Sequence, residues 1–139
     1  MGQISKSRRI ASAVLWLVFI VFLSFAPVPV KDIFFTRGVA HPWEHLIAFL
    51  IAAFLLAIAE VVPMVMVCGA TIALGVFLEV SQVVIYHNRF EYRDLLIDVA
   101  GAALGCLIAR ALRSRAIRRR LLGVRRIITR RYPERLGSL

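Results

Sequence analysis

Apolar residues dominate four long stretches of this chain, at residues 10–26, 43–62, 64–86 and 94–112. A helix needs roughly 17 to 25 such residues to cross a bilayer, so each stretch is long enough to span a membrane. Short segments with prolines or charged residues separate the stretches. The pattern therefore predicts an all-α, polytopic membrane protein with four transmembrane helices.

The composition agrees with a membrane location. The 139 residues are 60% hydrophobic, with a mean hydropathy of +0.81, yet the net charge is +10. A soluble domain of this size is rarely so apolar. The first stretch follows Lys6, Arg8 and Arg9 as a secretory signal would, but its length favours an uncleaved anchor.

Basic residues at the two ends of the chain predict its orientation. Three precede the first stretch, and eleven arginines lie between residues 110 and 135. By the positive-inside rule both termini then lie in the cytoplasm. We expect a multi-pass protein of the bacterial cytoplasmic (inner) membrane, whose loops 27–42 and 87–93 face outward.

The predicted organisation has three parts: a basic cytoplasmic N-terminus at 1–9, a membrane domain at 10–112 and an Arg-rich tail at 113–139. Apolar residues recur at helical spacing in the tail: Ile117, Leu121, Val124 and Ile128. This predicts an amphipathic surface helix attracted to anionic inner-leaflet lipid. Nucleic acid is not an expected partner, because the tail lacks the interleaved aromatic residues and motifs of nucleic-acid-binding segments.

Polar side chains occur in the last two apolar stretches, at Glu79, Gln82, Asp94 and Asp98. An ionised group at mid-membrane costs about 2.5 to 3.5 kcal/mol on insertion scales, so such residues mark functional sites by default. Glu79 and Gln82 are three residues apart and the two aspartates four apart, so each pair shares a helix face. The predicted orientation places both pairs in one outward layer.

Three further residues are expected to join this layer. His45 lies in the first turn of the second stretch, and Arg89 and Arg93 come from the loop before the fourth. Arginine offers a planar, permanently charged fork that suits phosphate or carboxylate. Carboxylates, an imidazole and guanidinium groups are therefore predicted to converge near the outer surface.

The order of these residues resembles the signature of the VanZ-like membrane proteins, over residues 41–108. The residues that carry the resemblance are His45, the segment 79–82, Arg89, Asp94, Gly101 and Gly105. The resemblance implies a small polytopic protein with an outward polar cluster, and it supplies no reaction. The chain departs from the family pattern at His41-Pro42, where members often carry Asp-Lys, and at Asp98, where they often carry asparagine.

The leading hypothesis is an outward polar pocket that binds, and in one version modifies, a phosphate-bearing envelope lipid or related amphiphile. The catalytic candidates are His45, Glu79 and Asp94, and the ligand-binding candidates are Gln82, Arg89, Arg93 and Asp98. The sequence does not decide whether the protein is an enzyme. The alternative is a non-catalytic accessory or structural subunit of a larger membrane protein complex.

The polar residues also have plainer interpretations. Glu79, Gln82 and His45 could simply hydrogen-bond one helix to another. Asp94 could be only a helix N-cap. The two arginines could neutralise nearby carboxylates rather than bind a ligand.

A metal site is a further alternative, since His45, Glu79, Asp94 and Asp98 can all ligate cations. Their spacing matches no zinc motif, and Pro42 is expected to keep His41 off the helix that carries His45. The sequence therefore leads us to expect no metal and no cofactor.

Small residues predict where helices pack closely. Gly101 and Gly105 form a GxxxG pattern, and Gly69 with Ala73 forms a second small-residue stripe.

Overall fold

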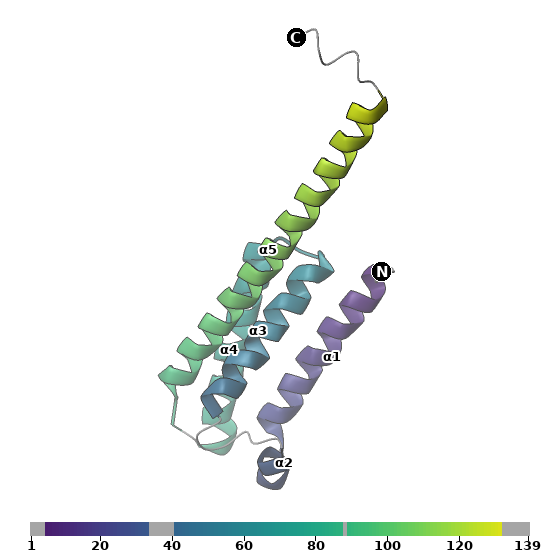
Figure 1. Cartoon of the computed structure of the whole chain (residues 1–139). Coiled ribbons are helices and arrows are strands. Elements are labelled where there is room, and N and C mark those ends of the chain that lie inside the picture. The colour runs from purple at the N-terminus through teal and green to yellow at the C-terminus, as the bar shows by residue number, and fades with distance from the viewer. Residues whose placement is uncertain (1–4, 34–40, 88, 132–139) are drawn as a thin grey trace. The chain divides into compact units, whose positions relative to one another are not determined.

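Helices make up the regular structure of the described part of the chain, which contains no strand (Figure 1). The structure, a computed structural model, describes residues 5–33, 41–87 and 89–131, but not the side chains of Val28, Asp32 and residues 116–131. The helices are α1 (Lys6–Phe25), α2 (Val28–Ile33), α3 (His41–Ala59), α4 (Met64–Tyr86) and α5 (Tyr92–Arg131). The chain forms two compact units, Met1–Ala109 and Arg110–Leu139.

Four of the helices are long and apolar enough to cross a membrane: Lys6–Phe25, His41–Ala59, Met64–Tyr86 and the Tyr92–Arg115 part of α5. This confirms the predicted all-α architecture and the four spans. The short α2 was not predicted. It forms because the Pro27 carbonyl accepts hydrogen bonds from the backbone N–H groups of Val30 and Lys31, at 2.9 and 3.2 Å.

Three helices begin earlier than the hydrophobic pattern predicts, namely α1, α3 and α5. Ser5 caps α1, since its Oγ accepts a hydrogen bond from the Arg8 backbone N–H at 3.4 Å. The third helix, α3, begins at His41, so the expectation that Pro42 keeps His41 off the helix is wrong. Proline is tolerated in the first turn because the N–H that it lacks would have no partner within the helix.

Hydrogen bonds between helices fix the direction of α1 relative to α3. Arg9 Nη1 donates to the Ile58 carbonyl at 2.8 Å, and Trp16 Nε1 donates to the Ala48 carbonyl at 2.9 Å. The start of α1 thus lies beside the end of α3, so the two helices run antiparallel (Figure 1).

The fourth helix runs parallel to α1, because the Tyr86 hydroxyl donates to the Phe25 carbonyl at 3.1 Å. Left-handed backbone at Glu60 and His87, each with φ of 56°, follows α3 and α4 respectively. The end of the bundle that carries Phe25, His41, Tyr86 and Tyr92 is called the His41 end below.

A close backbone contact joins α3 to α5 at Gly101 and Gly105. A Cβ added at Gly101 would lie 2.5 Å from the Leu46 carbonyl oxygen, and one at Gly105 would overlap the Leu50 carbonyl. Only a residue without a side chain allows the two backbones to approach so closely. Buried side chains of α3, α4 and α5 form a core cluster beside this contact: Ala53, Ala57, Val67, Ala102, Cys106 and Ala109.

Gly69 differs from the two glycines of α5. It is exposed, and a Cβ added there would meet no atom of the described chain within 4 Å. The packing role predicted for Gly69 is therefore not found among the described residues, because its side of α4 is exposed.

The second unit contains the end of α5, which the structure draws as one continuous helix to Arg131. The sequence instead predicts a separate surface helix in the tail at 113–139. The side chains that would define its apolar face lie outside the described ones, and so do residues 132–139. The surface position of the tail stays a prediction.

Alanine substitutions test the contact between α3 and α5. Gly101→Ala and Gly105→Ala should each lower the free energy of unfolding by about 1 to 3 kcal/mol, the usual cost of overpacking. The matched control is Gly69→Ala, which should leave stability unchanged or raise it by about 0.5 to 1 kcal/mol, since alanine favours the helix. Unfolding in mixed detergent micelles measures this, and equal stabilities of all three variants would contradict the contact.

Candidate functional site

Two histidine–aspartate pairs join α3 to α5 at the His41 end. An ionised carboxylate only accepts hydrogen bonds, so the imidazoles donate. His41 Nε2 bonds to Asp94 Oδ2 at 3.1 Å, and His45 Nδ1 bonds to Asp98 Oδ1 at 2.8 Å. Both aspartates are buried, with exposures of 5% and 4%. Because the pairs are four residues apart on both helices, they form two successive bridges between parallel helices.

Asp94 does more than a helix cap requires. It is the third residue of α5, and its own backbone N–H donates to the Glu91 carbonyl at 3.0 Å. A carboxylate in the first turn complements the positive end of the helix dipole. Its bond to His41 on another helix goes beyond that, so Asp94 also belongs to the contact between α3 and α5.

Glu79 connects α4 to the start of α5. Its side chain is buried, and its Oε1 accepts a hydrogen bond from the backbone N–H of Glu91, just before α5 begins. The first N–H groups of a helix lack partners within the helix, so a carboxylate there is stabilised by both the bond and the dipole. This contact places Glu79 beside the two histidine–aspartate pairs.

Among the described residues, carboxylates outnumber the cationic side chains that line the pocket. Besides the buried Glu79, Asp94 and Asp98, the half-buried Glu44 has an Oε2 atom without a hydrogen-bond partner in the described chain. Glu91 is exposed as a residue, but partial burial of its carboxyl and then the neighbouring Asp94 carboxylate raise its pKa. The local electrostatic potential therefore favours a positive ligand or ion.

A pocket of about 280 Å³ adjoins the paired residues and opens between α1, α3 and α4. One part of its wall is apolar and comes mainly from α1 and α3: Trp16, Phe19, Ile20, Leu23, Ile47, Ala48, Phe49 and Leu78. The other part is polar: Ser24, Lys31, His41, Glu44, His45, Glu79, Gln82 and Asp98. A pocket with both kinds of wall suits a ligand that is itself amphiphilic.

The arginines do not share this pocket with the other predicted residues. Arg89 is exposed and does not line it, and Arg93 lines a separate hollow beside Trp43 and Leu96. His45, Glu79, Gln82 and Asp98 are brought together as the sequence predicts. The two guanidinium groups do not line this pocket in the described structure, so their convergence with the other residues stays a prediction.

Lys31 is a pocket residue that sequence reasoning missed. Its Nζ donates to the Ser24 carbonyl at 3.0 Å and lies 5.6 Å from the centre of the Tyr86 ring. These contacts hold the ammonium at the polar end of the pocket. Only the fold of α2 against the ends of α1 and α4 brings it there, and no local sequence signal indicates this.

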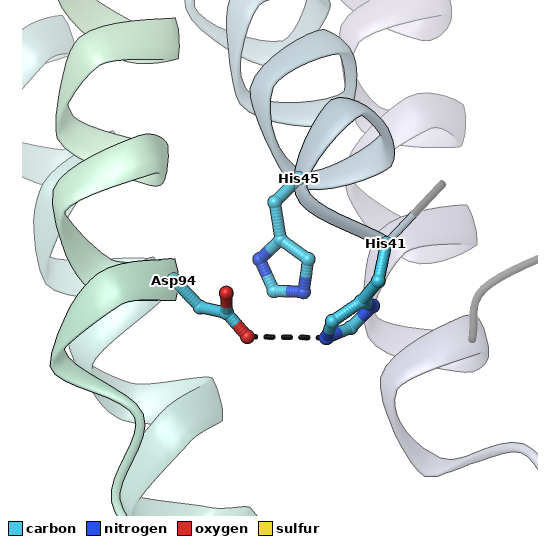
Figure 2. A group of neighbouring side chains, drawn as sticks. All are labelled: His41, His45 and Asp94. Carbon is cyan, nitrogen blue, oxygen red and sulfur yellow. Dashed lines mark hydrogen bonds and ion pairs between the residues drawn. The ribbon is translucent and has the colours of Figure 1, made fainter. Parts of the chain in front are cut away.

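His41 was missed for a different reason. The spacing of His41 and His45, four residues apart, would have indicated a shared helix face if Pro42 had been placed inside the helix. In the structure their rings meet edge to face, with centroids 4.6 Å apart. Figure 2 shows both rings converging on the Asp94 carboxylate, and one ligand atom from each of the three residues lies within 4.8 Å of the others.

Comparisons of the chain with models of known protein families, with curated proteins and with solved structures gave no match. The interpretation of the site therefore depends on its geometry and charge.

A double-mutant cycle tests the inner histidine–aspartate pair. His45→Ala leaves Asp98 buried without its partner, so the free energy of unfolding should fall by about 3 to 5 kcal/mol. The double variant His45→Ala/Asp98→Ala should lose at least 1 kcal/mol less than the sum of the single variants, since contacting residues are coupled by about 0.5 to 3 kcal/mol. Unfolding in mixed micelles provides the values, and additive losses would show that the pair contributes no interaction energy.

Proposed function

We propose that this chain is an integral membrane protein of the VanZ-like kind whose pocket binds a phosphate-bearing envelope lipid or a related amphiphile. The observation that carries the proposal is the division of one pocket wall into an apolar part and a polar part. The volume of about 280 Å³ is at the lower end of ligand pockets, which run from about 300 to 1,000 Å³. It fits a headgroup with the first part of a chain rather than a whole lipid.

The apolar part of the wall is where the acyl chain of the lipid would bind. Trp16 and Phe19 of α1 pack against each other, with ring centroids 5.4 Å apart, and both line the pocket. Phe49 of α3 also lines the pocket. Such rigid aromatic surfaces bury acyl methylene groups at little entropic cost.

The polar part of the wall is where the lipid headgroup would bind. Lys31 supplies a compact positive charge for phosphate, in the role that the sequence assigns to Arg89. Glu79 and Glu44 suit an ammonium group, so a zwitterionic aminophospholipid matches both signs of charge. His45, held by Asp98, is the group that could transfer a proton to or from the bound headgroup if the protein modifies it.

The proposed orientation puts the His41 end toward the outside of the cytoplasmic membrane. It follows from Lys6, Arg8 and Arg9, which lie at the opposite end of α1 and would face the cytoplasm. The pocket would then be open to lipid of the outer leaflet.

A reporter at two positions tests this orientation. Alkaline phosphatase should be active when fused within the 87–91 connection and inactive when fused at the C-terminus, because it folds only outside the cytoplasm. A fluorescent protein fused at the C-terminus should fluoresce, because it folds in the cytoplasm, and one fused within the 87–91 connection should not. Activity of phosphatase at the C-terminus would contradict the orientation.

A pocket-filling variant tests lipid binding. Ala48→Phe adds a ring to the pocket wall and should reduce the phospholipid retained through purification in mild detergent at least tenfold, as counted by native mass spectrometry. The matched control is Ala70→Phe, the same change at an exposed position of α4, which should retain lipid like the original chain.

Lys31→Gln tests recognition of the lipid headgroup independently of binding of the acyl chains. It should lower the preference for a phospholipid over the corresponding diacylglycerol, while retention of the diacylglycerol stays unchanged. Equal lipid retention by Ala48→Phe and Ala70→Phe would contradict the pocket as the binding site, and an unchanged preference in Lys31→Gln would contradict recognition of phosphate.

A further inference from the structure

We propose that His41, His45 and Asp94 form a binding site for one divalent transition-metal ion, of the kind that Zn²⁺ represents. Imidazole nitrogens and a carboxylate oxygen are the ligands that zinc takes in sites with three protein ligands and one open position. This inference is independent of which ligand occupies the pocket.

The first argument is the geometry of the ligand atoms. One atom from each of the three residues lies within 4.8 Å of the others, and His41 Nε2 is already 3.1 Å from Asp94 Oδ2. Ligand atoms about 2.0 to 2.2 Å from a tetrahedral ion are about 3.3 to 3.6 Å apart. One of the three distances is therefore already close to this value, and the other two, at no more than 4.8 Å, need only small side-chain rotations to reach it. Figure 2 shows the three side chains pointing toward a common centre.

The second argument is the bond behind His45. Asp98 Oδ1 accepts the hydrogen bond from His45 Nδ1 at 2.8 Å, so the lone pair of the neutral ring is on Nε2. Histidines that bind metals almost always donate their other ring nitrogen to a carboxylate, carbonyl or water, which fixes the ring and makes the ligand more basic. Asp98 is buried at 4% exposure and holds His45 in this way.

The third argument is charge. The region holds three buried carboxylates, while Arg89 and Arg93 lie outside the pocket. His41 Nδ1 is also buried without a hydrogen-bond partner in the described chain. When an ion replaces the proton shared by His41 Nε2 and Asp94, that proton is released to solvent or taken up by Nδ1. A divalent ion would then balance the excess of carboxylates.

The experiment is a titration of the full chain with ZnCl₂ in detergent, without added lipid, after chelator treatment and purification through a tag that lacks histidine. Calorimetry should give one zinc per chain. His41→Ala, His45→Ala and Asp94→Asn should each weaken the affinity at least tenfold. Asp98→Asn should keep the stoichiometry and weaken the affinity about 10- to 100-fold. The matched control is His87→Asn, at the exposed end of α4, which should bind like the original chain.

A second measurement keeps the test valid if the alanine variants fold poorly. Co²⁺ bound to the original chain should show the intense visible absorption of a four-coordinate nitrogen and oxygen site, which ZnCl₂ should abolish. Absence of zinc binding by the original chain, or an equal loss of affinity in His87→Asn, would overturn the proposal. Because no lipid is present, a failure of the proposed lipid binding would leave this result unaffected.

Discussion

The close contact between α3 and α5 is the constraint on which the rest of the bundle depends. Helices ordinarily pack 8 to 10 Å apart, a distance that aspartate, with its single methylene, bridges poorly. Gly101 and Gly105 remove the side chains that would hold the backbones apart. The same approach lets the short aspartates reach histidines one helix away, and those bonds satisfy carboxylates that would be costly to leave unpaired in a membrane. Glycine contact and polar bridges therefore support each other along one pair of helices.

Charge in this region is arranged differently from what the sequence predicts. The arginines of the loop before α5 do not line the pocket, so Lys31 is the permanently charged cation among its described lining residues, beside Glu44, Glu79 and Asp98. Glu79 is partly compensated by the backbone N–H of Glu91 and the positive end of α5. A phosphate ligand and three buried carboxylates repel each other, whereas a bound cation attracts both. The proposed metal site and the proposed phosphate-bearing ligand are thus electrostatically compatible, since an ion at the histidines would lower the cost of bringing phosphate beside them.

Much of this arrangement could be predicted from the sequence because membrane helices must satisfy their own backbone. Hydrophobic length alone locates the four spans, and helical periodicity alone places Glu79 with Gln82 and Asp94 with Asp98. The partners of these residues could not be obtained that way. The pairing of His41 with Asp94 and of His45 with Asp98 requires knowing that α3 and α5 are parallel neighbours, in one particular register. Lys31 reaches the pocket through the fold of α2, and Arg89 does not line it, so both outcomes depend on tertiary structure that no spacing encodes.

The two sides of the pocket are held by different kinds of contact. On one side, α3, α4 and α5 are joined by buried carboxylates and by backbone contact at glycine, which tolerate little movement. On the other side, α1 is joined to α3 by Arg9 and Trp16, whose side chains donate to carbonyl oxygens of α3. The α1 helix also has the smallest buried share of the four spans, at 11%. The α1 side of the pocket is therefore the more exposed side, while the buried carboxylates belong to α4 and α5.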